Sequence, residues 1–141
     1  MKKVLSFIFA FLLYLSFCAC SSTADKELNN AIEKADELVS TWHNEGYGGC
    51  IYKSEYISEQ DGFEVRMYMV NARYPSSLDS ENPTTSTFLK NLMVGRISDE
   101  LYPQLVEIFK DLDVSIGFTL SDQNGKNTYY SMLDGETIYS K

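Results

Sequence analysis

Three dipeptides that favour tight turns separate runs of alternating polar and apolar residues, and they constrain the fold more than any other feature of the chain. They are Asp61-Gly62, Asn124-Gly125 and Asp134-Gly135. Asn-Gly and Asp-Gly are the preferred central residues of two-residue hairpin turns, because both positions need a positive φ. We therefore expect three antiparallel hairpins, two of them consecutive in the C-terminal third.

If each loop is two residues long, the turns also determine which residues face one another. In the first hairpin, apolar residues occupy alternate positions of Phe63–Asn71, which predicts that they face the core. The predicted pairs are Ser58 with Val65, Tyr56 with Met67 and Ser54 with Met69. A slip of one residue would place Lys53 and Glu55 opposite the apolar set, so we expect no slip.

In the C-terminal third, Ile116, Phe118 and Leu120 alternate with small or polar residues. This pattern predicts a strand with its apolar residues towards the core. The predicted pairs on the core face are Leu120 with Tyr129, Phe118 with Ser131 and Ile116 with Leu133. On the same register, four residues fall on the opposite face: Thr119, Tyr130, Met132 and Tyr139.

A long amphipathic helix is predicted before the first hairpin. From Leu28 to Trp42, apolar residues recur at i, i+3 and i+4, which places them along one side of a helix. Gly46 is expected to end this helix, because glycine readily adopts the left-handed conformation that follows many helices.

Further helices are predicted between the hairpins. A stripe from Phe88 to Met93 is closed by Gly95, and a second stripe reaches Leu112 from a start at Ser98 or, because of Pro103, at Tyr102. Residues 75–87 have no periodicity and are expected to form a surface loop. The predicted fold is α+β: an antiparallel sheet of about five strands with two or three helices packed on one face.

The N-terminus has the pattern of a secretory signal. Lys2 and Lys3 precede an uncharged run of 16 residues from Val4 to Ala19. A basic region followed by a short apolar region is typical of signal peptides, whereas a helix that crosses a bilayer needs about 20 residues. Residues 1–19 are therefore expected to be a signal peptide, with the small residue Ala19 before the cleaved bond.

The segment Phe17-Cys18-Ala19-Cys20 resembles the lipobox of bacterial lipoprotein precursors, which usually reads Leu, a small residue, Gly or Ala, and Cys. The last two positions match, and Phe17 and Cys18 depart from the pattern. The resemblance implies that the Cys20 thiol carries a diacylglycerol, with acylation of the new N-terminus, and two or more acyl chains give stable anchoring. The alternative is a signal that is cleaved elsewhere or retained, with an unmodified Cys20.

This interpretation divides the chain into a signal peptide at 1–19, a short tether at 20–24 and a single domain at 25–141. It also implies export and lipid anchoring in the cell envelope, at the periplasmic side of the outer membrane or at the cell surface. Lys2 and Lys3 are two of the 12 basic residues, so ten remain against 20 acidic residues, a net charge of about −10. Such a surface repels phosphates, so we expect no nucleic-acid partner.

His43 and Cys50 form the most specific catalytic pair that the residues suggest, while a pair among the 20 acidic residues stays open without any residue that singles it out. A cysteine nucleophile needs a nearby base and usually a third group that orients the base, here Glu45. No flanking motif supports the pair, and a histidine at a helix end with a buried free thiol is the simpler interpretation. We therefore assign no catalytic residue.

No metal site or cofactor is predicted. One histidine and one free thiol cannot complete a zinc site without carboxylates. Asp79, Glu81 and Asn82 lack the glycine and the distal glutamate of an EF-hand loop. The sequence also lacks a phosphate-binding loop and a dinucleotide-binding fingerprint.

Tyrosines are the remaining candidates for a site. Tyr130 and Tyr139, with Thr119 and Met132, would form an aromatic strip on the uncovered sheet face. Tyrosine combines an apolar ring with a polar tip and suits binding surfaces. The alternative is cross-strand packing that only stabilises the sheet.

Three classes of function remain open. The preferred one is a non-catalytic binding module, displayed on a membrane, for a protein, peptide or glycan. The others are a structural or assembly subunit of an envelope complex and a small extracytoplasmic enzyme that uses His43 and Cys50. An exposed aromatic face favours the first, a large apolar patch the second, and a pocket with shifted pKa values the third.

Overall fold

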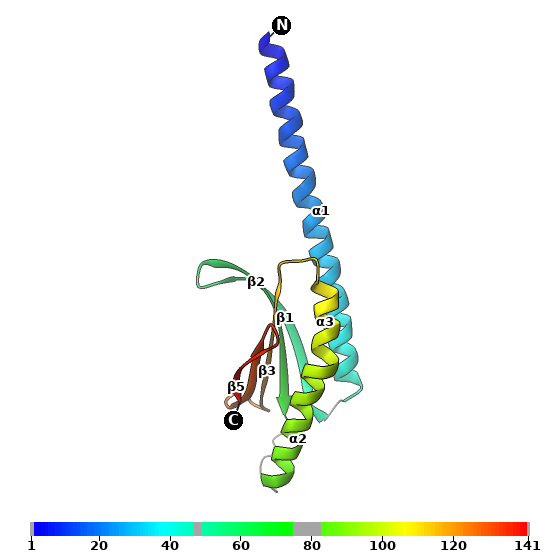
Figure 1. Ribbon diagram of the computed structural model, residues 1–141, viewed down its shortest axis with the longest axis vertical. Coiled ribbons are helices and arrows are strands. Elements are labelled where there is room, and N and C mark those ends of the chain that lie inside the picture. The colour runs from blue at the N-terminus through cyan, green and yellow to red at the C-terminus, as the bar shows by residue number, and fades with distance from the viewer. Residues whose placement is uncertain (1, 47–48, 75–82, 141) are drawn as a thin grey trace.

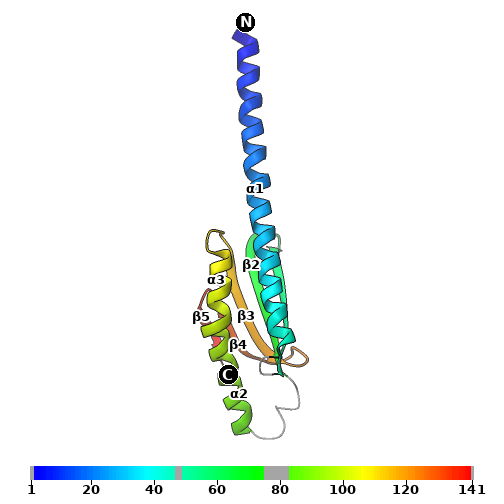
Figure 2. The same cartoon turned by 90° about the vertical axis from the view of Figure 1, so that its right-hand side faces the viewer.

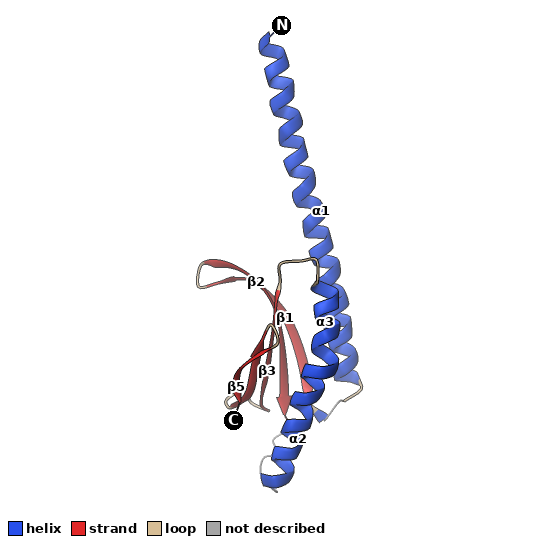
Figure 3. Cartoon of the chain, in the orientation of Figure 1, coloured by secondary structure: helices blue, strands red, loops and turns tan. Residues whose placement is uncertain are grey.

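The computed structural model describes the backbone of residues 2–46, 49–74 and 83–140, and the side chains of 23–46, 49–74 and 87–140. Its elements are α1 (Lys2–Asn44), β1 (Ile51–Gln60), β2 (Phe63–Tyr74), α2 (Pro83–Arg96), η3 (Ile97–Leu101), α3 (Tyr102–Phe109), β3 (Ser115–Asp122), β4 (Thr128–Leu133) and β5 (Glu136–Ser140). The five strands form one sheet in the order β1-β2-β3-β4-β5, and the helices lie on one side of it (Figures 1 and 3). The α+β fold is therefore confirmed.

The sheet is mixed rather than purely antiparallel. Three neighbouring pairs are antiparallel, but β2 and β3 run parallel, from Met67 opposite Ser115 to Tyr74 opposite Asp122. The segment α2-η3-α3 connects these two strands. A chain that crosses a sheet through a helix returns to the end at which the first strand began, so the next strand is parallel. The prediction of antiparallel pairs throughout overlooked this crossover.

Helix α1 is longer than the sequence predicts. It runs without a break from Lys2 to Asn44, so residues 20–24, the predicted tether, are helical. Its second half packs on the sheet through the predicted stripe of buried residues, Ala31, Ala35, Val39 and Trp42. The first half extends beyond the sheet (Figures 1 and 2). Within the described residues, no helix combines the length and the apolar character that a membrane crossing requires.

The helices of the crossover form one continuous segment from Pro83 to Phe109. The sequence predicted a loop up to residue 87 and a stop at Gly95, and both predictions are wrong where the structure describes these residues. At η3 the helix widens into a π-helix, in which the Tyr102 N–H donates to the carbonyl of Ile97. Pro103 has no N–H and its ring crowds the preceding turn, so the wider turn accommodates it without ending the helix.

The turns of the first and third hairpins form as predicted. Asp61 and Gly62 have φ values of 53° and 81°, and Asp134 and Gly135 have 48° and 83°. In the second hairpin only Gly125, at 70°, is left-handed, and the Asp122 N–H donates to the Asn127 carbonyl at 2.9 Å. The loop between β3 and β4 is therefore longer than the predicted two residues.

A β-bulge in each hairpin shifts the predicted registers by one residue. In the first hairpin Gln60 faces Phe63 as predicted, but beyond the irregularity Glu55 faces Met69, which is the slip that the sequence argued against. Between β3 and β4 the irregularity follows Leu120, and between β4 and β5 it follows Ser131. A bulge adds one residue to one strand only, so every pair beyond it changes partner.

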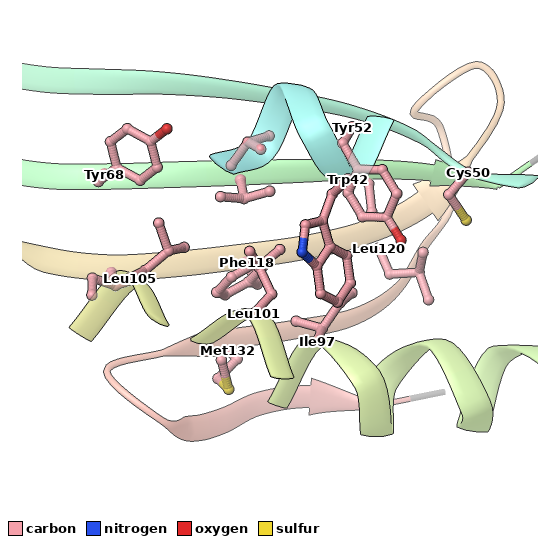
Figure 4. Close-up of a cluster of buried hydrophobic side chains, with 14 of the residues drawn as sticks. Trp42, Cys50, Tyr52, Tyr68, Ile97, Leu101, Leu105, Phe118, Leu120 and Met132 are labelled. Atoms are coloured by element: carbon pink, nitrogen blue, oxygen red, sulfur yellow. The ribbon is translucent and has the colours of Figure 1, made fainter. Parts of the chain in front are cut away.

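The bulges decide which side chains enter the core. Strand β2 buries Tyr68, Val70, Ala72 and Tyr74 under the helices, instead of the predicted set that includes Met67 and Met69. Strand β3 buries Ile116, Phe118 and Leu120, as predicted. Figure 4 shows three of these strand residues, Tyr68, Phe118 and Leu120, together with the core residues of the helices. The labelled helix residues are Trp42, Ile97, Leu101 and Leu105.

Candidate functional site

The structure separates the four residues that were predicted to share a binding face. Tyr130 faces Leu120, Met132 faces Phe118, and both side chains are buried, at 4% and 3% exposure. Thr119 faces Ser131, which in turn faces Tyr139, so these residues lie on the uncovered side of the sheet. The predicted strip of Tyr130 beside Tyr139 is therefore wrong, because the β3–β4 bulge moves Tyr130 and Met132 to the helix side.

A row of polar residues crosses the uncovered face through all five strands. Each member is the register partner of the next: Lys53, Asn71, Thr119, Ser131 and Tyr139. Register partners on neighbouring strands project from the same face, so their side chains lie side by side. The Thr119 hydroxyl donates to the Asn71 side-chain oxygen at 2.5 Å, which links the row across the parallel β2–β3 pair.

A second row lies beside the first one, nearer to the loop between β3 and β4. It contains Arg73, Ser121 and Thr128, again as register partners. The two rows line a cleft of about 350 Å³, called here the polar cleft: Lys53, Ser54, Glu55, Asn71, Arg73, Thr119, Ser121, Gly125 and Thr128. An adjoining hollow of about 440 Å³ shares Thr128 with the cleft and is lined also by Lys126, Asn127, Ser131 and Tyr139.

Two basic side chains of the polar cleft form no ion pair with the acidic residues that the structure describes. Within the described part of the chain, no carboxylate lies within 4 Å of the charged groups of Arg73 and Lys53. Glu55 also lines the cleft but makes no ion pair with either of them. Gly125 brings the loop backbone close to Arg73, because a Cβ there would lie 3.7 Å from one guanidinium nitrogen.

An apolar group lies beside the polar rows on the uncovered face. Met69, Gly117 and Leu133 are register partners in the row that begins with Glu55. The end of the Met69 side chain fills the space that a side chain at position 117 would occupy. On the uncovered face, the polar rows towards the Gly125 loop are thus followed by a small apolar group at the middle of the strands.

The structure describes no contact between His43 and Cys50 that would activate the thiol. The His43 Nδ1 accepts the Tyr52 N–H at 3.4 Å, so this nitrogen already has a donor. Burial raises the pKa of Cys50 to about 11. At neutral pH Cys50 is therefore a protonated thiol, which is a poor nucleophile.

The acidic residues do not cluster into a metal site where the structure describes them. No group of three or more His, Cys, Asp or Glu residues is placed to hold a metal ion in this part of the chain. The Asp122 carboxylate accepts the Lys126 N–H and the Asn127 amide, both at 2.7 Å, and so closes the β3–β4 loop. Asp79, Glu81 and Asn82 lie outside the described residues.

The sequence predicted Thr119 and Tyr139 but missed the other residues of the two polar rows, among them Lys53 of β1 and, in β2, Asn71 and Arg73. A signal for them exists in β2, where Tyr68, Val70, Ala72 and Tyr74 are all apolar or aromatic while Asn71 and Arg73 are polar. In Phe63–Met69 the apolar residues occupy odd-numbered positions, whereas here they occupy even-numbered ones. The second half of the strand determines which side chains of β2 face the core. Comparison with known proteins gives no further guide, because no family model, curated protein or solved structure matches the chain.

Proposed function

We propose that the protein is an exported, lipid-anchored binding module whose ligand occupies the polar cleft on the uncovered sheet face. The signal-like N-terminus and the lipobox-like segment support export and attachment through Cys20. The side chain of Cys20 lies outside the described residues, so the anchor rests on the sequence alone. The membrane is then one partner, and a protein, peptide or glycan of the envelope is the other.

The observation that carries this proposal is the polar row from Lys53 to Tyr139. A sheet face that no helix covers can carry many kinds of polar residue without forming a site. Here hydroxyl, amide and basic groups line a cleft. The cleft is built on paired strands that are backed by the core, and sites on such elements are held more precisely than sites on loops. The protonated Cys50 and the absence of a metal cluster among the described residues give no comparable support for catalysis.

Capture from native envelope tests the proposal. The full lipidated protein in detergent is immobilised and exposed to a detergent extract of the envelope, and retained proteins and glycans are quantified by mass spectrometry. The double substitution Asn71→Ala and Thr119→Ala removes the linked pair at the centre of the row. We expect it to reduce retention of the specific ligand about tenfold, a change of about 1.4 kcal/mol in binding free energy.

The matched control substitutes an amide and a hydroxyl elsewhere, Asn29→Ala and Ser40→Ala, both exposed on α1. This control should retain the ligand as the wild type does, and thermal unfolding should confirm that both double variants are folded. Equal retention by the cleft variant and the control would contradict a binding role for the polar cleft.

A further inference from the structure

We infer that the ligand of the polar cleft is an oligosaccharide that bears carboxylate groups. This inference rests on the proposed function and names the chemistry of its ligand. It follows from the charge of the cleft, the chemistry of its lining and the length of the polar row.

The charge of the cleft selects an anion. The whole chain has a formal net charge of −8, yet the cleft holds Arg73 and Lys53 together against the single carboxylate of Glu55. Neither basic group is within 4 Å of a carboxylate among the described residues. A guanidinium binds a carboxylate through two parallel hydrogen bonds, so Arg73 is suited to a carboxylate on the ligand. Glu55 then remains to accept a hydrogen bond from a ligand hydroxyl.

The lining of the cleft selects a sugar rather than a peptide. Apart from Gly125, every lining residue carries a hydroxyl, an amide or a charge, so the cleft offers no apolar pocket to a peptide side chain. The buried centre of a protein interface is depleted of charged groups and enriched in aromatic residues, unlike this lining. The hydroxyls of Ser121 and Thr128 can both donate and accept, and the Thr119 oxygen, whose proton goes to Asn71, can still accept, which matches the hydroxyls of a saccharide.

The neighbouring hollow adds an aromatic surface to the same row. Tyr139 is 45% exposed at the far end of the row from Lys53. Its ring combines an apolar face with a polar tip, which suits the apolar face of a sugar ring and its hydroxyl rim. Five strands at an interstrand spacing of about 4.8 Å make the row about 19 Å long, so it can contact several linked sugars.

Titration of the lipidated protein in detergent with defined probes tests the inference. The acidic probes are hexamers of galacturonate and of hyaluronan, each paired with its carboxyl-methylated form, and a hexaglutamate peptide is the third arm. We expect at least one acidic hexamer to bind at least tenfold more tightly than its methylated form and than the peptide. Raising the salt concentration should weaken the acidic complex, because charge pairs at an exposed site are screened.

Two substitutions connect the binding to the cleft. Arg73→Gln should weaken the acidic hexamer at least tenfold but leave the weak binding of the methylated form unchanged, and Arg73→Lys should restore part of the loss. Tyr139→Ala should weaken both forms by a similar factor, because it removes a contact with the ring. The control is Arg66→Gln, since Arg66 is exposed on β2 and pairs with Glu64 away from the cleft; it should bind as the wild type does.

Each other outcome overturns the inference. Binding of hexaglutamate as tight as that of the acidic hexamers would make the cleft an acidic-peptide site. Equal binding of acidic and methylated hexamers would remove the role of charge. If no acidic hexamer binds, the ligand class is wrong, while the proposed function is decided separately by envelope capture with the Asn71→Ala, Thr119→Ala variant.

Discussion

Cys50 lies in the core near Trp42 and Tyr52 and is 3% exposed. Burial raises its pKa from 9.0 to about 11, because the thiolate loses its hydration. We expect a thiol reagent at pH 8 to label Cys50 slowly in the native protein and rapidly in denaturant. Rapid native labelling would contradict the buried thiol and would restore the nucleophile as a candidate.

The same shift has a consequence for stability at high pH. Since the pKa is higher in the folded state, the protonated thiol contributes stability fully below about pH 9, and this contribution is lost as the pH rises towards 11. The difference in unfolding free energy between wild type and Cys50→Ala should therefore shrink between pH 9 and pH 11, as measured by urea denaturation. A constant difference across this range would show that the thiol does not titrate differently in the two states.

At Gly117, a side chain could be introduced only if the Met69 side chain moved. A Cβ at this position would overlap the Sδ of Met69, which is the flexible end of its side chain. We expect Gly117→Ala to cost about 1–3 kcal/mol of stability and to cost at least about 0.5 kcal/mol less in a Met69→Ala background. Denaturant unfolding of the four proteins of the cycle measures both values.

Gly95 provides the control for this substitution. A Cβ there meets no atom within 4 Å, and Gly95 lies inside α2. Gly95→Ala should therefore be neutral or stabilising by up to about 1 kcal/mol, because alanine favours a helix. Equal costs of Gly117→Ala with and without the Met69 side chain would show that Met69 is not the obstacle.

Among the elements, α1 is joined to the sheet through the Asp36 carboxylate, in addition to the bond between His43 and Tyr52 and to apolar contacts. Asp36 accepts the hydroxyls of Ser54 and Tyr68, both at 2.7 Å. The Tyr68 side chain is buried, so losing Asp36 removes the acceptor of a buried hydroxyl. We expect Asp36→Ala to destabilise the protein by about 1–3 kcal/mol, measured by denaturant unfolding.

Two further variants separate this bond from a general effect on the helix. Glu33→Ala, at an exposed position one turn earlier in α1, should change stability by less than about 0.5 kcal/mol. Asp36→Ala should cost less in a Tyr68→Phe background, because the buried hydroxyl is then already absent. If Asp36→Ala were as mild as Glu33→Ala, the bond would not hold α1 to the sheet.

The elements themselves were largely predictable, whereas their alignment was not. Turn dipeptides and periodicity locate the hairpins and the stripe from Ala31 to Trp42, because both signals are local. A bulge leaves no local signal: Tyr129 and Ile138 are ordinary strand residues, and only packing against the helices selects the shifted register. Tyr129 lies under the Lys90 ammonium of α2, 4.4 Å from the ring centre, a contact that depends on the tertiary fold.

The candidate site was also only partly predictable from the sequence. Thr119 and Tyr139 were placed on the correct face, but Tyr130 and Met132 were not, because they lie beyond the β3–β4 bulge. The polar cleft also depends on the parallel β2–β3 pair, which brings Asn71 beside Thr119 from 48 positions away. Periodicity within one strand carries no information about such a neighbour.

For the molecule as a whole, α1 connects the proposed anchor to the domain as one helix. Ala31, the first residue of the buried stripe, lies eleven positions after Cys20, which corresponds to about 17 Å of helix. We expect Cys20→Ala to abolish partition of the protein into a detergent phase, because the acyl chains would be missing, and Cys18→Ala to leave it intact. Intact mass should show a chain that starts at residue 20 with added acyl mass; a mature chain without lipid would contradict the anchor.

The parallel pairing of β2 with β3 also bears on how fast the chain can fold. Hairpins and helices form from near neighbours, but every β2–β3 pair joins residues 48 positions apart, as in Met67 with Ser115. Closing so long a loop costs entropy before any contact is gained, so this step is expected to limit the folding rate. The last strands complete the core from the C-terminal side, so a nascent chain that ends before Ser115 has helices and a hairpin but no closed core. The rate of folding is thus expected to depend on this one crossover more than on any hairpin or helix.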